Sequence, residues 1–528
     1  MKRRQRRLRV GALIGALSAV ASVGGPIARA APSASDAGVK VDFASPRGPL
    51  FRSERVNNLY PADQFQAELA TDVAFLNAKG LHGRIYRVWV SDMNFDPKTG
   101  RTDPNLVGVF DPKTGKYDFD SLTPYLAQAS QVSESLLVVL NLQSMVRAGW
   151  TPARTEPVIK TIIFELKRRF PKIKYIEALN EADYNLREFI QAEDLYRYYV
   201  PFYQAVNEVN AELRPAIPLL VGGPNTGSCG SPWAPSGPNN QKWLQKFLDG
   251  YAADPDPGKR LDFLSYHAYG YFRNQANCSD YSAIRSDPSV LAQQRSRTDE
   301  ELRKRGLDVN IPSFITEMGP YPGPSYDDKQ DPRPDYLRQA AGMASYTYWF
   351  MESPKDVPFQ WLLRHDTNGR KDQLVSHAPA GQPVQTGVFT PYGNSLVMLS
   401  KMKARRVSAV SDGVQAGKGA YVIASEDTSG VSVMVWNYQL TGADHIRVNL
   451  DLSNLPARLR NKPLRERIFR IDAATSNYFA DPSKAELQMV SERTLTGART
   501  LKETAELEPN ALQLILIEPR DSIPTRRR

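Results

Sequence analysis

Between about residue 83 and residue 366, the chain alternates short apolar runs with longer stretches of helical hydrophobic periodicity. The apolar runs predict strands at residues 83–90, 136–142, 174–180, 218–223, 261–267, 311–317 and 358–364, and we expect one more between Leu50 and Tyr60. The intervening stretches predict helices at residues 65–78, 156–170, 194–213, 240–251, 288–306 and 336–351. Strands that are apolar throughout and separated by helices are typical of a parallel sheet covered on both faces.

This alternation favours an α/β fold in which the strands close into a (β/α)₈ barrel, or TIM barrel, with enlarged loops. A doubly wound open sheet is the alternative arrangement of such units. No G-x-G-x-x-G motif follows a predicted strand to support that alternative.

The pattern changes after Lys403, where short strand-like runs are separated by turn residues. These runs, at residues 419–425, 430–438, 445–452, 465–471, 488–493 and 511–518, predict a C-terminal antiparallel β-sandwich. The early segment 38–43 could add a strand to it. We therefore expect a barrel at residues 31–403, a β-sandwich domain at 404–522 and a basic tail at 523–528.

The first 30 residues have the composition of an export signal. Residues 10–22 form an apolar run that is short for a bilayer span, and Ala28-Arg29-Ala30 matches a cleavage site. The segment contains no acidic residue and seven basic ones: Lys2, Arg3, Arg4, Arg6, Arg7, Arg9 and Arg29. A membrane anchor is the alternative, but we expect a cleaved signal peptide, residues 1–30, and a secreted or periplasmic protein.

Charge and composition then exclude several classes of protein. The 528-residue chain has a formal net charge of +10, but most of the excess lies in the signal and in the terminal Arg526, Arg527 and Arg528. A nearly neutral body gives no reason to expect a nucleic-acid partner. Five histidines and two cysteines form no HExxH motif or zinc-ligand spacing, so we expect no metal and no cofactor. No second apolar stretch is long enough to cross a membrane, and we favour a monomer.

Two predicted strands end on glutamates. Residues 174–180 run into Glu181 and residues 311–317 end at Glu317, which makes these strands about the fourth and seventh of eight. In such a barrel the active site lies at the carboxyl ends of the strands, so the two carboxylates would face each other. Retaining glycoside hydrolysis needs this pair, one protonated and one ionised. Alternatively, Asn180 caps a helix that has Glu181 in its first turn, and Glu317 is an ordinary loop carboxylate.

The segments around both glutamates resemble clan A glycoside hydrolases, and family 39 in particular, which includes β-xylosidases, α-L-iduronidases and bacterial exopolysaccharide hydrolases. The segments that carry the resemblance are GRIYRVWV (83–90), YDFD (117–120), KYIEALNEAD (174–183), LLVGGP (219–224), DFLSYHAY (262–269), ITEMG (315–319) and PYGNSLVMLSKM (391–402). The resemblance as a whole covers most of residues 45–440. The chain departs from the family at Leu179, Ala182 and Met318, where many members have Trp, Pro and Trp.

The resemblance implies a role for each matching position. Glu181 would be the general acid and then the general base, which requires burial or a nearby negative charge to keep it protonated near neutral pH. Glu317 would be the nucleophile, kept ionised by the cation of Arg87. Asn180 would donate a hydrogen bond to the sugar hydroxyl beside the anomeric carbon.

Aromatic and histidine side chains complete the predicted substrate site. His267 and Tyr269 alternate on the sixth strand and so share one face, where His267 could orient a glutamate, contact the sugar or simply be a core histidine. Trp361 could stack on a sugar or pack in the core. Trp150 and Trp233 lie in loops over the same mouth and are candidates for outer subsites.

The two cysteines lie in the loops that follow the fifth and sixth strands. Cys229 falls within residues 225–240 and Cys278 within residues 270–282. These loops are neighbours in a barrel, and an oxidising compartment permits a disulfide. We therefore expect a Cys229–Cys278 disulfide between two substrate-facing loops.

These features predict a secreted retaining glycoside hydrolase that acts on a poly- or oligosaccharide by double displacement. We favour a bacterial exopolysaccharide because the tryptophans that flank both glutamates in many family members are absent. One alternative is an arabinofuranosidase or uronidase on the same scaffold. The other is a non-catalytic barrel that only binds carbohydrate.

Overall fold

The computed structural model describes residues 35–59, 76–77, 79–93, 108–227, 242–269, 287–319, 333–361, 375–376, 388–440 and 442–520. The chain divides into two units, Met1–Ser33 and Ala34–Arg528, and every described residue belongs to the second. No helix within these ranges is both long and apolar enough to cross a membrane.

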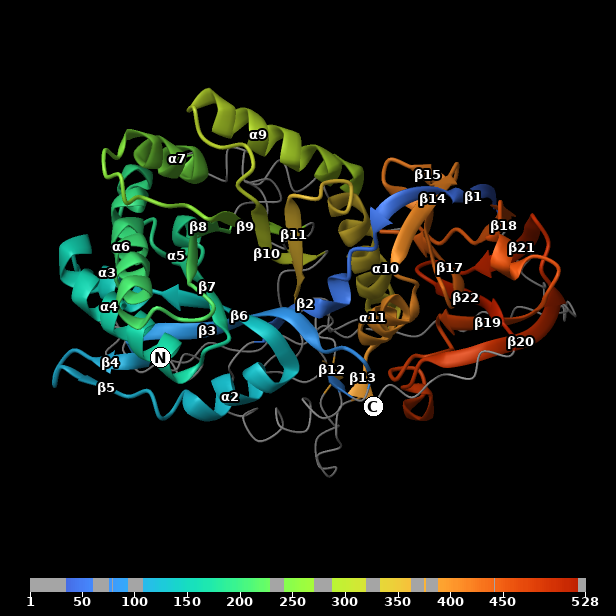
Figure 1. Ribbon diagram of the computed structural model, residues 1–528, viewed down its shortest axis with the longest axis horizontal. Coiled ribbons are helices and arrows are strands. Elements are labelled where there is room, and N and C mark those ends of the chain that lie inside the picture. Colours follow the sequence, from blue (N-terminus) through green and yellow to red (C-terminus); the bar gives the residue numbers. More distant parts are fainter. Residues whose placement is uncertain are drawn as a thin grey trace, which may run out of the picture. The chain divides into compact units, whose positions relative to one another are not determined.

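Parallel strands form the closed barrel that the sequence predicts (Figure 1). In chain order they are β2 (Val56–Leu59), β3 (Gly83–Met93), β6 (Ser133–Asn141), β7 (Ile173–Ala178), β8 (Leu220–Thr226), β9 (Phe263–Tyr269), β10 (Ser313–Gly319) and β11 (Asp356–Gln360). Each pairs in parallel with the next, and β11 returns to β2. The short β4 (Gly108–Asp111) and β5 (Lys116–Tyr117) extend from the end of β3. The (β/α)₈ fold class is confirmed.

Helices between the strands cover the outside of the barrel (Figure 1). They are α2 (Thr123–Val132), α3 (Gln143–Arg147), α4 (Pro152–Arg169), α5 (Ala182–Asn185), α6 (Leu195–Leu213), α7 (Trp243–Ala253), α9 (Gln294–Lys304), α10 (Arg333–Phe350) and α11 (Pro391–Lys401). Short 3₁₀ turns lie at η1 (Ser53–Arg55), η3 (Ala192–Asp194) and η5 (Pro288–Gln293). Most of the helix expected at residues 65–78 lies outside the described residues.

The barrel interior is layered, because alternate residues of each strand point inward. On β3 these are Ile85, Arg87 and Trp89, all buried. One apolar layer consists of Val56, Ile85, Leu137, Phe263, Phe314 and Phe359. A second apolar cluster consists of Trp89, Val139, Tyr269 and Trp361. Arg87 lies between these two levels and marks a polar level inside the barrel.

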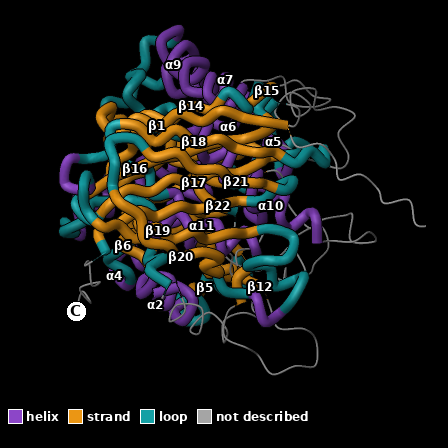
Figure 2. Tube along the Cα trace, turned by 90° about the vertical axis from the view of Figure 1, so that its right-hand side faces the viewer, coloured by secondary structure: helices purple, strands orange, loops and turns teal. Residues whose placement is uncertain are grey.

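A second sheet contains the C-terminal strands and the first strand of the chain (Figure 2). Its members are β1 (Ser35–Pro49), β14 (Arg405–Ser411), β15 (Val414–Gln415), β16 (Lys418–Asp427), β17 (Gly430–Tyr438), β18 (Ile446–Ser453), β19 (Pro463–Ile471), β20 (Gln488–Thr496), β21 (Leu501–Leu507) and β22 (Leu512–Pro519). β1 lies between β14 and β18, antiparallel to the first and parallel to the second. The expected extra strand at residues 38–43 is therefore present in this sheet.

Strands β14, β15 and β21 are absent from the sequence-based prediction. β14 (RRVSAVS) buries only Val407, and β21 (LKETAEL) buries only Ala505 and Leu507. Strands that bury so few apolar residues give a weak periodic signal. The sheet pairs them through their backbones with neighbours that are far away in sequence.

Helix α10 joins the barrel to the second sheet. The indole nitrogen of Trp349 donates a hydrogen bond to the hydroxyl of Tyr421 at 2.8 Å. The buried indole of Trp436 on β17 donates to the hydroxyl of Ser345 at 2.8 Å. The same helix packs on β10 and β11 of the barrel, so it contacts both sheets.

Candidate active site

Arg87, which is fully buried on β3, organises the polar level of the barrel. Its Nε donates to Glu177 Oε2 at 2.6 Å, and its Nη1 donates to Glu317 Oε1 at 2.8 Å. Its other hydrogen bonds go to the side-chain oxygens of Asn58, at 3.1 Å, and Asn180, at 2.9 Å. A single guanidinium thus binds side chains from β2, β7, the turn after β7, and β10.

Glu317 lies near the carboxyl end of β10 and is 5% exposed. Its two oxygens accept hydrogen bonds from different donors, Oε1 from Arg87 and Oε2 from the Tyr269 hydroxyl at 2.7 Å. Burial raises the pKa of Glu317, and the nearby Arg87 and Tyr269 oppose that rise. Arg87 therefore contacts Glu317 as expected, but it limits an upward shift and does not produce a downward one.

Glu181 follows β7 directly and reaches the barrel mouth from a left-handed backbone conformation, with φ 47° and ψ 48°. Its side chain is 29% exposed, and burial raises its pKa to about 7. Arg87 opposes that rise only through space, because its hydrogen bonds go to other side chains. Near neutral pH a large fraction of Glu181 is therefore protonated.

His267 lies between the two glutamates on β9 and is fully buried. Its Nδ1 lies 2.8 Å from Glu181 Oε1, and its Nε2 lies 3.5 Å from Glu317 Oε1. Burial lowers the pKa of His267 to about 4, so the ring is neutral near pH 7. A neutral imidazole can donate to the carboxylate form of Glu181 or accept from its protonated form.

One ligand atom from each of Glu181, His267 and Glu317 lies within 4.8 Å of the other two. Such a set could in principle hold a divalent cation. However, the guanidinium of Arg87 already binds Glu317 at 2.8 Å, and a second cation would be repelled there. Within this set, an oxygen of Glu181 lies within 4.8 Å of an oxygen of Glu317.

Asn180 lies in the turn after β7, directly before Glu181, and is 8% exposed. Its side-chain oxygen accepts from Arg87 Nη2 at 2.9 Å and from Asn225 Nδ2 at 3.0 Å. These two bonds fix the orientation of the amide, so its NH₂ group is the side available for donation to a ligand.

Of the predicted aromatic residues, Tyr269 and Trp361 share one buried cluster beside Glu317, whereas Trp150 belongs to the main core cluster. Tyr269 binds Glu317, and Trp361 directly follows β11 at 6% exposure. The Trp361 ring packs edge to face on Trp89 with centroids 6.2 Å apart. Trp150 packs against Phe110, with 6.0 Å between ring centroids. Trp233 and both cysteines, Cys229 and Cys278, lie outside the described residues.

Sequence reasoning missed three polar residues that support the site: Asn58, Glu177 and Asn225. Glu177 lies on β7 within the run KYIEA and accepts a hydrogen bond from Arg87. A charged residue in a buried strand is uncommon, and this could have marked Glu177 in the sequence. Asn58 on β2 binds Arg87 and also donates to the carbonyls of Thr316 and Gln360. No local pattern marks Asn58 or Asn225, because the partners of both lie on or next to other strands.

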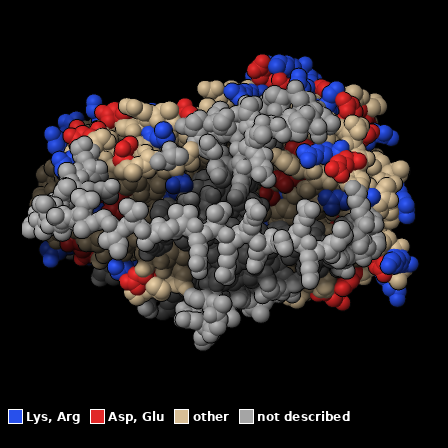
Figure 3. Space-filling view, turned by 180° about the vertical axis from the view of Figure 1, so that it is seen from behind, with Lys and Arg blue, Asp and Glu red and all other residues tan. Residues whose placement is uncertain are grey.

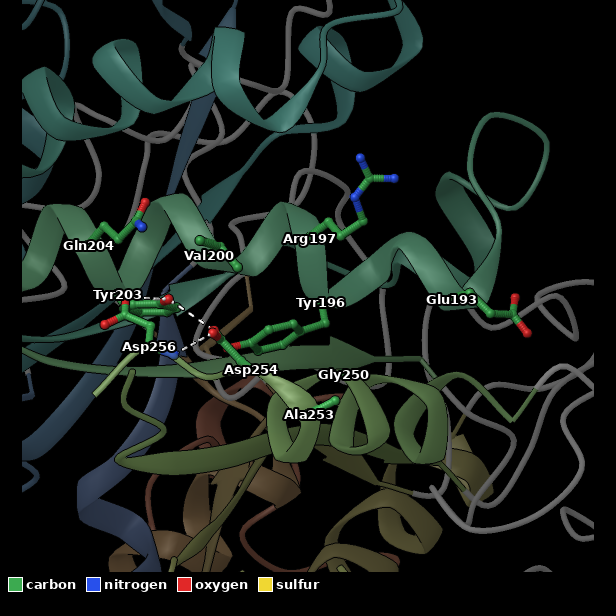
Figure 4. A pocket seen from close by; sticks show the side chains of 10 residues that line it. All are labelled: Glu193, Tyr196, Arg197, Val200, Tyr203, Gln204, Gly250, Ala253, Asp254 and Asp256. Atoms are coloured by element: carbon green, nitrogen blue, oxygen red, sulfur yellow. Dashed lines mark hydrogen bonds between the residues drawn. The ribbon is translucent and has the colours of Figure 1, made fainter. Parts of the chain in front are cut away.

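The surface has two further features. On the face in Figure 3, the coloured basic and acidic side chains are interspersed. A hollow of about 440 Å³ lies between α6 and the end of α7 (Figure 4), where the Tyr203 hydroxyl donates to Asp254 at 3.0 Å and to Asp256 at 2.9 Å. None of the predicted site residues lines this hollow.

Comparisons with known proteins show the fold. No protein-family model matches the chain. No curated protein matches it either. Solved structures do match: a bacterial orthologue of human α-L-iduronidase has a TM-score of 0.66 at 14% identity, over 93% of this chain and 85% of that one.

Two further structures have similar scores. The GH39 enzyme from Xanthomonas axonopodis pv. citri has a TM-score of 0.61 at 16% identity, over 94% of this chain and 100% of that one. A monomeric β-xylosidase from Caulobacter crescentus CB15 has a TM-score of 0.60 at 15% identity, over 92% of this chain and 99% of that one. The chain thus has the two-domain fold of these enzymes along nearly its whole length.

Proposed function

We propose that this protein is a retaining glycoside hydrolase with Glu317 as its nucleophile and Glu181 as its general acid and base. The observation that carries the proposal is the pair itself, two glutamates at the ends of β7 and β10 with carboxylate oxygens within 4.8 Å. Two carboxyl groups this close share one proton, because both cannot ionise easily.

The environments of the pair decide where that proton resides. Glu317 accepts from Arg87 and Tyr269, and both donors favour its ionised form. Glu181 contacts the neutral His267 and has a pKa of about 7. The proton therefore resides on Glu181, which is the arrangement needed for the first step of a double displacement.

In the first step a carboxylate oxygen of Glu317 attacks the anomeric carbon, while Glu181 gives its proton to the glycosidic oxygen. The glycosidic bond breaks, the alcohol leaves, and the sugar is esterified to Glu317. In the second step Glu181 takes a proton from water, the water oxygen attacks the anomeric carbon, and the ester bond breaks. Both glutamates return to their starting forms and the anomeric configuration is retained.

Asn180 and the aromatic residues would bind the sugar. The NH₂ group of Asn180 is oriented by Arg87 and Asn225 and would donate to the hydroxyl next to the anomeric carbon. The aromatic rings of Trp89 and Trp361 lie in the same cluster as Tyr269, which contacts Glu317. Aromatic faces of this kind commonly pack on sugar rings.

The substrate we propose is a poly- or oligosaccharide, with a bacterial exopolysaccharide favoured, and the protein acts outside the cytoplasm. The similar structures are described as a β-xylosidase, a GH39 enzyme and an iduronidase orthologue, all consistent with glycoside hydrolysis. A uronidase or arabinofuranosidase is the alternative within this chemistry. Residues 1–30 support export, which would be checked by an N-terminus at Ala31 in the extracellular or periplasmic fraction.

The decisive experiment combines a panel of aryl glycosides and polysaccharides with NMR of the first-formed product. We expect release of the sugar with the anomeric configuration of the substrate. A 2-deoxy-2-fluoro glycoside with an activated leaving group should then trap the ester on the peptide that contains Glu317. An inverted product, or a label on another residue, would contradict the assignment.

A further inference from the structure

The predicted acid/base lies on a strained turn. Leu179 and Glu181 both have positive φ, 68° and 47°, on either side of Asn180. A left-handed conformation is unfavourable for a non-glycine residue, because its Cβ comes too close to the following carbonyl oxygen. Such residues persist only where surrounding contacts hold them.

The contacts come from the end of β8. The backbone oxygen of Asn225 accepts from the Glu181 N–H at 2.8 Å. Its side-chain nitrogen donates to the Leu179 carbonyl at 3.3 Å and to Asn180 Oδ1 at 3.0 Å. Asn225 is fully buried and thus fixes the backbone of the whole turn.

Gly227, two residues further along, fixes the side chain of Glu181. A Cβ added at Gly227 would lie 2.6 Å from Glu181 Oε1 and 2.7 Å from its Cδ and Cγ. The Gly227 backbone therefore lies directly against the carboxyl group. Its N–H donates to Asp183 Oδ1 at 2.8 Å, and Asp183 is only 7% exposed.

We propose that Asp183 is a positioning residue for the general acid, because it holds the Gly227 backbone against the Glu181 side chain. The proposal rests on the function proposed above and adds a residue to it. Asp183 acts through Gly227, and its bond to the Gly227 N–H passes from α5 back to the end of β8. Without that bond the Gly227 backbone no longer packs firmly against the Glu181 carboxyl, which can then turn away from the glycosidic oxygen.

This role has a kinetic signature that a general loss of stability lacks. A poor leaving group needs a proton from the general acid, whereas 2,4-dinitrophenolate leaves without one. Displacing Glu181 should therefore slow hydrolysis of a methyl or alkyl glycoside much more than that of the dinitrophenyl glycoside. The ratio of kcat/KM for the alkyl glycoside to kcat/KM for the dinitrophenyl glycoside therefore reports whether Glu181 is in position to donate its proton.

Three variants test the role. Asp183→Ala should lower kcat/KM for the alkyl glycoside by about 10–100-fold and for the dinitrophenyl glycoside by less than about threefold. Asp183→Asn keeps an oxygen acceptor for the Gly227 N–H and should stay within about threefold of the wild type on both. Gly227→Ala should resemble Asp183→Ala, because its methyl group displaces the Glu181 carboxyl.

Asp262→Ala is the matched control. The Asp262 carboxyl also accepts a backbone N–H bond, from Val221 at 2.7 Å, at the opposite end of β8 from Gly227. This contact does not involve the turn of Glu181, so its truncation should lower Tm and reduce both kcat/KM values equally.

Two results would overturn the inference: an equal loss on both glycosides in Asp183→Ala, or a loss in Asp183→Asn as large as that in Asp183→Ala. If Asp183→Ala does not fold, Gly227→Ala decides, and an unchanged leaving-group ratio there has the same consequence. A wild-type protein that hydrolyses neither glycoside would overturn the proposed function itself.

Discussion

Two levels of the barrel interior are built on the same strands and behave in opposite ways. The lower level is the apolar layer of Val56, Ile85, Leu137, Phe263, Phe314 and Phe359. The polar level is the group centred on Arg87, with Glu177 and Glu317 as its ion-pair partners. On β3 the two levels are only two residues apart, at Ile85 and Arg87.

The difference lies in what each level requires of its neighbours. The rings of Phe263 and Phe314 stack with centroids 4.5 Å apart, and apolar packing of this kind needs shape but no specific partner. The polar groups need hydrogen-bond partners, and not every atom has one. Among the described residues, Glu177 Oε1 and His267 Nε2 make no hydrogen bond, and His267 Nε2 comes only to 3.5 Å from Glu317 Oε1. The lower level thus stabilises the fold. The polar level lowers the stability of the fold, because its buried polar groups are placed for catalysis and are not all paired.

The largest expected effect is on catalysis. Glu317→Gln removes the nucleophile at nearly constant volume and should lower kcat on an aryl glycoside by at least about 10⁴-fold. The Tm of thermal unfolding should fall only modestly, because the amide oxygen can still accept from Arg87, although the NH₂ group cannot accept from the Tyr269 hydroxyl. Glu466→Gln is the control, since Glu466 is equally buried and paired with Arg493 but lies in the second sheet. Activity within tenfold of the wild type in Glu317→Gln would show that another residue is the nucleophile.

The next effect is on stability at the polar level. Arg87→Met leaves two buried carboxylates without their cation, and should lower the free energy of unfolding by about 3–5 kcal/mol at pH 7. Urea unfolding measures it. The loss should shrink at pH 5, because burial raises the pKa of Glu317 and protonation removes the unpaired charge. An equal loss at both pH values would mean that lost packing, and not charge, is the cause.

The lower level should separate stability from activity. Phe314→Ala removes a buried ring and should cost about 3 kcal/mol of unfolding free energy by urea titration. Because Phe314 is in the apolar layer, kcat per folded molecule should stay near the wild-type value at a temperature well below Tm. A fall in kcat as large as that of Glu317→Gln would show that the two levels are not independent.

The smallest expected effect concerns pH. Glu181 must be protonated for the first step, and burial raises its pKa to about 7. On this basis kcat/KM should fall about tenfold between pH 6 and pH 8. Glu181's contribution to stability has the same sign, since it is complete below its unfolded pKa and is lost as pH rises through about 7.

Asp92→Asn is the control for the pH profile. Burial also raises the pKa of Asp92 to about 7, so its titration could produce the same fall in kcat/KM between pH 6 and pH 8. Because Asp92 lies outside the catalytic pair, the variant should keep the wild-type profile. If the fall in kcat/KM disappears in Asp92→Asn, the pKa that controls activity belongs to Asp92 and not to Glu181.

The barrel and its carboxylates were accessible from sequence for a physical reason. Strands buried on both faces, such as β6 and β10, must be apolar along their length, and that pattern is local. A glutamate at the end of such a run, like Glu317, has an uncommon position that the apolar residues before it make visible. Strands that bury few residues, such as β14 and β21, lacked this signal and were missed.

By itself the sequence determined the alternation of strands and helices, the change of pattern after Lys403, and the two glutamates at strand ends. Only the tertiary structure decided the other contacts around those glutamates: Glu177 and Asn58 on Arg87, and Asp183 on the Gly227 backbone. Hydrophobic periodicity is written along one segment, whereas the pKa of a carboxyl depends on burial and on charges from segments up to 230 positions away. Closing the barrel brings those segments within hydrogen-bond distance.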